Sequence, residues 1–435
     1  MARSPAELLA PGRPLTLAGV ADGAEGLVVA DLARAAAVGA DAGAVGLLVV
    51  CRDGQRMSAL ARALGFFAPD IVALEFPAWD CLPYDRVPPH AAFVAQRMAV
   101  LARVARAQQD QSPTVLLTTV NAALQRVPAR NFVTKEALSI AAGNVLAMDR
   151  VIQWLELNGF MRASTVREPG DYAVRGGIID LYAPGTAEPV RLDYFGDTLE
   201  SIRSFDPESQ RTTDQLRRLD LVPVAEFQLT PDTIKRFRLG YVEAFGAPTP
   251  DDLLYEAVSE GRRHPGMEHW LPLFHDRLDT LFDYVPGACV VLEPLAEDAV
   301  RERLGQIKDY YEARQQALTE RGAGPPYKPL PPARLYVEES EWRERLDAAA
   351  LARLTPFTVP AGQGPAIDAQ TRQGRNFAAE RAEPGRNMFE ALAQHVTALQ
   401  AGGKRVIIAL WSEGARERMR HVLADHALAN LSSVV

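Results

Sequence analysis

The chain has 435 residues, of which 48% are hydrophobic and 23% are charged. This composition is typical of a folded globular protein, and the length predicts two to four domains rather than a single core. The formal net charge of −8 argues against a broad nucleic-acid-binding surface, because phosphate binding needs a local excess of Lys and Arg. A local basic face stays possible.

Cysteine usage and hydropathy exclude several classes of protein. Cys51, Cys81 and Cys289 are odd in number and form no CxxC spacing, so the sequence predicts free thiols rather than a disulfide framework or a zinc site. The histidines of residues 264–275 lack metal-ligand spacing, and we expect no metal. No stretch reaches the ~20 apolar residues of a membrane span, and the N-terminus lacks a signal-peptide core. We expect a soluble, cytoplasmic protein without membrane contact.

Strand and helix signals alternate over residues 1–120. The expected helices are Leu27–Ala37, Arg56–Phe66 and Ala91–Ala107, and the expected buried strands are Val45–Cys51, Ile71–Phe76 and Thr114–Thr119. This βαβ rhythm implies an open, mainly parallel sheet covered by helices, so the predicted fold class is multi-domain α/β.

The pattern changes in residues 121–216, which predict a small, inserted, antiparallel α+β domain. A short β-like stretch is expected at Asn131–Thr134 and a helix at Asp149–Leu157. Three strands separated by glycine turns are expected at Val174–Tyr182, Pro189–Phe195 and Glu200–Phe205.

The α/β pattern returns in residues 217–321, which we interpret as the second half of the first body. Its expected elements are a helix at Pro231–Phe245, a strand at Cys289–Leu292 and a long helix at Leu295–Arg321. Residues 322–387 are rich in Pro and polar residues and predict a linker. Residues 388–435 predict a partial α/β domain with helices Met388–Leu399 and Gly414–Leu423 and a strand at Arg405–Trp411.

The segment Leu17–Ala33 lies between the first expected strand and helix, where an α/β protein places its nucleotide-binding loop. A working phosphate loop follows G-x-x-x-x-G-K-[ST], in which the Lys neutralises phosphate and the hydroxyl ligates magnesium. Gly19 keeps the first glycine, but Gly23 comes one place early. Glu25 stands in the place of the Lys, and Gly26 in the place of the hydroxyl residue. We therefore predict no catalytic residue and no cofactor.

Two interpretations of this loop stay open on local grounds. It is either a nucleotide site that has lost its ligands or an ordinary glycine-containing loop that never bound nucleotide. The chain contains no GKT or GKS sequence and no DEAD-like acidic box elsewhere, so no other segment offers an ATPase site.

Two long segments carry a specific resemblance. Phe76–Val104, with the pattern F-P-x-W-(D/E)-x-L-P-Y-D-x-x-x-P followed by R-(M/L)-x-x-L, resembles the first domain of the transcription-repair coupling factor family (Mfd). Glu168–Thr212 is similar to the second domain of that family and to the matching domain of the excision-repair helicase UvrB. Gly266–Phe274 resembles the family's returning half-domain. The resemblance implies the family's N-terminal, UvrB-like module, with a degenerate phosphate-loop body and part of the following domain.

UvrB itself, an ATP-driven DNA helicase and repair enzyme, is the alternative that this resemblance leaves open. It keeps a functional phosphate loop, which Glu25 and Gly26 exclude here. It also carries a Tyr-rich, damage-probing hairpin, for which the segment from Tyr84 to Ala91 has no room. DNA-stimulated ATPase activity would favour this alternative.

Residues 170–205 can place two arginines and an aromatic side chain on one exposed face of an antiparallel sheet, which is the composition of an interface hot spot. In the resembling family and in UvrB this domain binds UvrA. The resemblance implies contacts at Arg175, Arg191 and Phe195 and, less directly, at Asp197, Glu200 and Arg203. The other interpretation is that Phe195 belongs to the core and the remaining charges are merely solvated.

The resemblance implies a non-catalytic adaptor and regulatory module of transcription-coupled nucleotide excision repair, which recruits UvrA to stalled RNA polymerase. The polymerase-binding and double-stranded-DNA translocase domains, with the ATP and Mg that they use, are expected beyond residue 435. The family also implies that a C-terminal domain masks the UvrA face. A structural spacer that binds nothing is the remaining alternative.

Overall fold

The computed structural model describes residues 10–38, 44–106, 112–320, 327–360, 365–383, 385–426, 428 and 431–432. Residues 322–326, the first part of the expected Pro-rich connector, lie outside these ranges, as do residues 1–9. Packing divides the chain into two units, Met1–Thr371 and Arg372–Val435.

The larger unit is built on a wholly parallel, seven-stranded sheet in the order β17-β1-β16-β15-β2-β4-β3. Its strands are β1 (Leu15–Ala18), β2 (Val45–Cys51), β3 (Val72–Phe76), β4 (Thr114–Thr119), β15 (Cys289–Leu292), β16 (Leu351–Leu354) and β17 (Ala366–Asp368). In β2, Leu48 and Val50 pack into one apolar core, whereas Leu47 and Val49 pack into a second core on the opposite face. Burial on both faces explains why these strands are continuously apolar.

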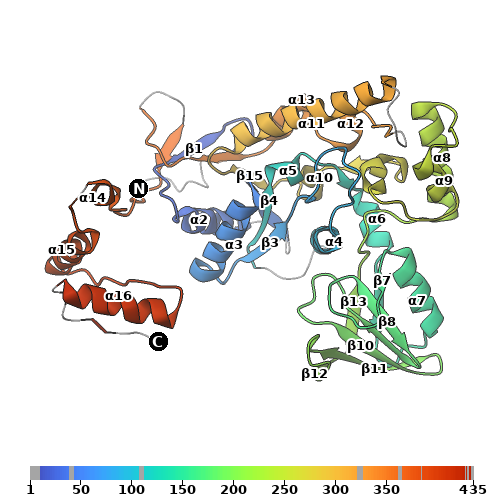
Figure 1. Cartoon of the computed structure of the whole chain (residues 1–435), viewed down its shortest axis with the longest axis horizontal. Helices are drawn as coiled ribbons and strands as arrows, with labels where there is room; N and C mark the ends of the chain where they lie inside the picture. The colour runs from blue at the N-terminus through green and yellow to red at the C-terminus, as the bar shows by residue number, and fades with distance from the viewer. Residues whose placement is uncertain are drawn as a thin grey trace. The chain divides into compact units, whose positions relative to one another are not determined.

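Helices cover both faces of this sheet (Figure 1). One face is covered by α2 (Glu25–Ala37) and α3 (Gly54–Phe67). The other is covered by α4 (Ala91–Ala105), α5 (Val120–Ala123), α10 (Leu281–Tyr284), α11 (Ala296–Thr319) and α13 (Glu339–Ala348). In the part of the chain that the structure describes, none of the helices combines the length and hydropathy that a bilayer crossing requires.

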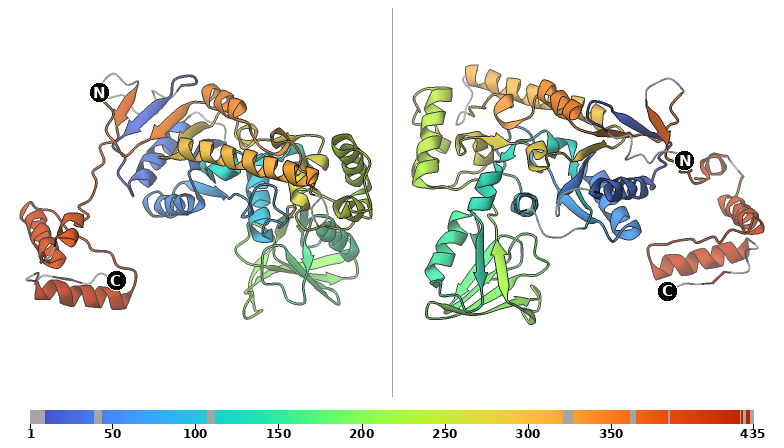
Figure 2. Two further views of the ribbon diagram at one scale, coloured as in Figure 1. Left: turned by 45° about the horizontal axis from the view of Figure 1, so that its top comes forward. Right: turned by 180° about the vertical axis from the view of Figure 1, so that it is seen from behind.

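A second, six-stranded sheet has the order β12-β11-β10-β9-β8-β7, with neighbours antiparallel except β7 and β8. Its strands are β7 (Met161–Arg162), β8 (Asp171–Arg175), β9 (Ile178–Leu181), β10 (Val190–Phe195), β11 (Thr198–Phe205) and β12 (Thr212–Leu216). Helix α7 (Met148–Leu157) packs against one face through Val151 and Leu155 (Figure 2). The expected strand Val174–Tyr182 is in fact the β8–β9 hairpin, because Gly176 takes a left-handed turn with φ of +59°.

The small domain begins and ends at one place. Strand β6 (Leu138–Ala141) pairs antiparallel with β13 (Arg218–Leu221), and both contribute to the core of the small domain. Helices α5 and α6 (Arg130–Lys135), by contrast, contribute Val120 and Val133 to the core of the parallel body. The boundaries expected at residues 121 and 216 therefore differ from the packing, which places the insertion between β6 and β13.

The remaining elements of the larger unit complete its packing. They are β5 (Val127–Pro128), which pairs with β14 (Leu278–Asp279), and α8 (Pro231–Phe245), α9 (Leu253–Ser259), the 3-10 helix η1 (Met267–Leu273) and α12 (Pro332–Leu335). Elements α8, α9, η1 and α12 share an aromatic-rich core. Burial lowers the pKa of both His269 and His275 to about 4, so both imidazoles are neutral near pH 7.

Two sequence predictions for the larger unit are wrong. Asn131–Thr134 lies within α6 and is helical. The linker expected at residues 322–387 contains α12, α13, β16 and β17, and β16 lies inside the parallel sheet between β1 and β15. With only four residues, β16 is too short to give a clear periodic signal in a polar neighbourhood.

The second unit contains α14 (Ala378–Ala382), α15 (Met388–Ala401) and α16 (Glu413–Asp425). The strand expected at Arg405–Trp411 is absent, because no strand of this unit's described residues lies beside it to accept its backbone hydrogen bonds. The described part of this unit is therefore helical rather than α/β, and Ile407 and Trp411 are exposed.

A buried ion pair joins the body to the segment that leaves the small domain. Arg97, in α4, is fully buried and donates from Nε to Glu226 Oε1 at 2.6 Å and from Nη1 to the Pro77 carbonyl at 2.9 Å. Its guanidinium carbon lies 4.4 Å from the ring centre of Phe76 and 5.8 Å from that of Trp79. The Phe-Pro-x-Trp and Arg positions of the resembling segment are therefore core positions.

Replacing Arg97 with Met should lower the free energy of unfolding by about 3–5 kcal/mol, because Glu226 would remain buried without a counter-charge. The double variant Arg97→Met/Glu226→Leu should recover part of this loss. Urea denaturation of both single variants and the double variant measures the coupling. Strictly additive losses would show that the two side chains do not act as a pair.

Candidate functional site

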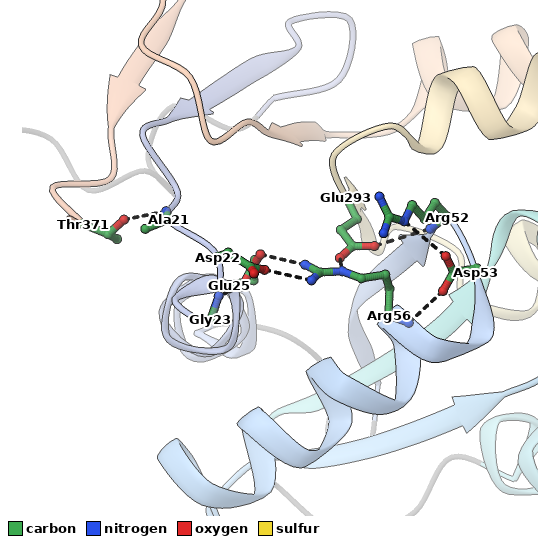
Figure 3. Close-up of polar contacts among 9 residues, drawn as sticks. All are labelled: Ala21, Asp22, Gly23, Glu25, Arg52, Asp53, Arg56, Glu293 and Thr371. Carbon is green, nitrogen blue, oxygen red and sulfur yellow. Dashed lines mark hydrogen bonds and ion pairs between the residues drawn. The ribbon is translucent and has the colours of Figure 1, made fainter. Parts of the chain in front are cut away.

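The carboxyl edge of the parallel sheet carries a charged cluster centred on Arg56 (Figure 3). Asp22 and Glu25 follow β1, Arg56 lies in the first turn of α3 after β2, and Glu293 follows β15. The Arg56 guanidinium binds Asp22 Oδ1 at 2.9 Å, Glu25 Oε1 at 2.7 Å and Glu293 Oε1 at 2.5 Å. We call these four residues the Arg56 cluster. It occupies the edge at which open α/β sheets bind their ligands.

Negative charge exceeds positive charge in the Arg56 cluster, since three carboxylates share one guanidinium. Burial opposes the charge on Arg56, but the hydrogen bonds that its guanidinium donates to the carboxylates, led by Asp22, outweigh burial and raise the pKa of Arg56. Burial raises the pKa of Glu293, and Arg56 offsets part of that effect. Excess negative charge at this edge disfavours phosphate, and the guanidinium groups of Arg56 and the neighbouring Arg52 are already engaged by carboxylates.

The backbone of the β1–α2 loop is also bound by the chain itself. Gly23 N–H donates to Glu25 Oε2 at 2.7 Å. Ala21 N–H donates to Thr371 Oγ1 at 2.7 Å, and the Thr371 hydroxyl donates to the Gly19 carbonyl at 2.6 Å. In a phosphate loop, amides at this place bind phosphate oxygens. Here the amides of Ala21 and Gly23 instead donate to side-chain oxygen atoms of the protein.

Gly26 has a packing role. A Cβ at this position, in the first turn of α2, would lie 2.8 Å from the Cβ of Ala63 in α3. The crossing of the two helices therefore excludes a side chain where a phosphate loop carries its hydroxyl. The structure brings Gly19, Gly23, Glu25 and Gly26 together at this edge. The descent of the loop from a nucleotide site stays a prediction.

The second candidate site is the face of the six-stranded sheet opposite α7, which we call the outer face. Strand register places Arg203, Arg191 and Asp180 side by side on β11, β10 and β9. Two residues further along β10, Asp193 pairs with Ile178 of β9, and Ile178 pairs on its other side with Arg175 of β8. Alternate residues of a strand share a face, so the three predicted arginines lie on the outer face together.

Two of these arginines are ion-paired within the face. Arg191 holds Asp180 with two hydrogen bonds of 2.6 and 2.9 Å, and its guanidinium carbon lies 5.0 Å from the ring centre of Phe205. Arg203 Nη2 lies 2.7 Å from Asp193 Oδ2. Hydrogen bonding to Asp180 raises the pKa of Arg191 above its ordinary value. The pairs fix the positions of both guanidinium groups.

The other predicted contact residues are exposed at one end of this face. The side chain of Phe195 is 76% exposed, so the interpretation that it belongs to the core is wrong. Asp197 lies in the β10–β11 turn, and Glu200 lies at the bulge of β11; both are exposed. Arg175 is also exposed, and its Nη2 donates to the Ser164 carbonyl at 2.6 Å rather than to a carboxylate.

Sequence reasoning missed the carboxylates that hold these arginines. Asp180 and Asp193 become partners only through strand register, and Arg56 and Glu293 are 237 residues apart in sequence. One signal was present: Asp180 and Glu293 lie within or directly after short apolar strands. A buried carboxylate in such a place requires a partner.

The cysteines offer no reactive site. Cys51 and Cys289 are buried and Cys81 is half-buried, and all three are free thiols. Burial raises the pKa of Cys81 to about 12, so this thiol is protonated near pH 7. Within the described residues, no group of three or more His, Cys, Asp or Glu side chains is placed to hold a metal ion.

Comparison with known protein families identifies the small domain. Residues 138–227 match the family model of the UvrB interaction domain. The match begins at β6 and ends shortly after β13, so it coincides with the insertion that the packing defines. The chain is thus a parallel α/β body that carries a UvrB interaction domain.

Transcription-repair-coupling factors are similar to the chain over most of its length. That of Haemophilus influenzae is 32% identical over 300 residues, which are 69% of this chain and 25% of the relative. That of Escherichia coli is 28% identical over 390 residues, 88% of this chain and 32% of the relative. The chain therefore spans about a quarter to a third of the length of these relatives. These matches show that it corresponds to an N-terminal region of the transcription-repair-coupling factor family.

Gly26→Ala should lower the free energy of unfolding by about 1–3 kcal/mol, because its Cβ would overlap Ala63, although alanine is the better helix former. Gly65→Ala is the matched control. This glycine is an exposed residue of α3 with open space around its Cβ position, so its substitution should stabilise the protein by about 0.5–1 kcal/mol. Urea denaturation compares them, and equal stabilisation by both substitutions would refute the packing role.

Proposed function

We propose that the chain is a docking module of transcription-coupled DNA repair and that it binds UvrA through the outer face of its six-stranded sheet. The observation that carries the proposal is the exposure of Phe195 within the segment that matches the UvrB interaction domain. An exposed phenylalanine beside arginines whose positions are already fixed has the chemistry of an interface hot spot. Relatives named for the coupling of transcription to repair support the biological setting.

The roles of the arginines differ in this proposal. Arg191 and Arg203 are held by Asp180 and Asp193, so they act mainly as ordered parts of the surface. Arg175 has no carboxylate partner among the described residues, and its exposed guanidinium can take a carboxylate of the partner in bidentate fashion. Ordering before binding reduces the side-chain entropy that association would otherwise remove.

We infer further that the parallel body is a scaffold without nucleotide chemistry, which makes the chain a non-catalytic adaptor. The support is the Arg56 cluster, which places excess negative charge where phosphates would lie. In a longer protein such an adaptor recruits UvrA to stalled RNA polymerase, while other regions bind duplex DNA, use ATP and Mg, and mask the outer face. For this role, the residues that do not belong to the outer face need only keep the chain stably folded.

Phe195→Ala should weaken UvrA binding by tenfold or more, since a buried aromatic anchor contributes at least about 1.4 kcal/mol. Titration calorimetry with the whole chain and purified UvrA measures the dissociation constant. Phe66→Ala is the control, because Phe66 is a similarly exposed phenylalanine (80%) on α3 of the body.

Phe66→Ala should bind UvrA as the unmodified chain does. Equal effects of the two substitutions, or no measurable binding by the unmodified chain, would contradict the proposed docking face.

A further inference from the structure

We infer that Val145 is a second apolar anchor of the outer face, paired with Phe195 in one contact with the partner. Val145 forms an isolated antiparallel bridge with Thr198, and Thr198 pairs on its other side with Phe195. Directly opposed residues of paired strands point to the same face. Val145 and Phe195 therefore flank Thr198 on one surface, with exposed fractions of 80% and 76%. This inference rests on the proposed function.

Backbone hydrogen bonds hold Val145 in place. Leu146 N–H donates to the Asp197 carbonyl at 2.9 Å, and Leu199 N–H donates to the Asn144 carbonyl at 3.0 Å. Gly143 N–H donates to the Leu199 carbonyl at 2.7 Å. The segment around Val145 thus continues the sheet beside the start of β11. A β-branched side chain on a backbone held in this way gives up little conformational freedom when a partner covers it.

The same end of the sheet also carries Arg175, which has no carboxylate partner among the described residues. Gly177, in the β8–β9 turn, accepts a hydrogen bond from Tyr194 N–H at 2.8 Å, which places the turn beside the end of β10. Arg175 precedes that turn. The order across the sheet is Arg175 on β8, then β9, Phe195 on β10, Thr198 on β11 and Val145. This row crosses four strand spacings and spans roughly 19 Å.

Charge and hydropathy in this row define the partner surface. The outer face carries Arg175, Arg191 and Arg203, and ion pairs within the face neutralise the last two. Arg175 has no carboxylate partner among the described residues, and Asp197 and Glu200 are exposed at the same end of the face. The complementary partner therefore presents a carboxylate opposite Arg175 and basic or hydrogen-bond-donating groups opposite the two acidic residues. An apolar recess next to that carboxylate receives Phe195 and Val145. The occupant is therefore the protein partner of the proposed function, and UvrA is the probe.

The test compares Val145→Ser with Val38→Ser in titrations of the whole chain with UvrA. Val38, which follows α2, is an equally exposed valine (84%) outside the small domain. Val145→Ser should weaken binding about tenfold, the effect of losing one buried valine. Val38→Ser and the conservative variant Val145→Ile should bind as the unmodified chain does. The Val145→Ser loss should persist at high salt, whereas an Arg175→Ala loss should shrink.

The outcomes separate this inference from the proposed function. If Phe195→Ala weakens UvrA binding and Val145→Ser does not, the second anchor is wrong and the docking face stands. If Val38→Ser weakens binding as much as Val145→Ser, the loss of affinity does not come from a contact at Val145, and the inference fails. If the unmodified chain does not bind UvrA, both the proposed function and the anchor fail.

Discussion

The guanidinium of Arg56, shared among Asp22, Glu25 and Glu293, is the interaction on which the parallel body depends. It joins the segments that follow β1 and β15 to the first turn of α3, so it holds the carboxyl ends of strands that are distant in sequence. Glu293 is only 2% exposed, and removing its partner would leave a buried charge uncompensated. The same arrangement places protein atoms where an α/β enzyme would place phosphate. The stability of the body and the proposed exclusion of phosphate from this edge thus have one physical cause.

The small domain has the opposite character. Its inner face packs against α7, but its outer face exposes Phe195, Val145 and Arg175 at one end, and no carboxylate of the described residues pairs with that arginine. It joins the body through β6 and β13 and through buried polar contacts such as Arg97 with Glu226 and Gln228 Nε2 with Asn158 Oδ1 at 2.8 Å. An exposed face on an inserted domain fits the proposed adaptor role, because function resides in the site rather than in the fold.

Local sequence patterns were sufficient for much of the fold. The apolar strands Val45–Cys51, Thr114–Thr119 and Cys289–Leu292 and the helix Pro231–Phe245 were predicted with the bounds that the structure has. Short elements whose stability comes from distant neighbours were not predictable, as the strand β16 shows. Arg405–Trp411 shows the reverse case, since an apolar run forms no strand where the described residues offer no partner strand.

The sequence was sufficient to name most residues of the candidate sites, but not to predict which of them contact one another. The exposed Phe195 and the arginines of one face followed from alternation along the strands together with the resemblance. The pairing of Arg191 with Asp180 depends on register, and Glu25 meets Arg56 only once α2 and α3 pack together. Val145 could not be found, because its bridge to Thr198 lies outside any regular strand.

The central claim is that the Arg56 cluster prevents nucleotide binding at the carboxyl edge of the parallel sheet. Calorimetric titration of the whole chain with Mg-ATP tests it most directly. The account predicts no saturable binding up to about 1 mM, a concentration at which even a weak site worth about 4 kcal/mol would be half filled. Saturable binding with a micromolar dissociation constant would contradict it.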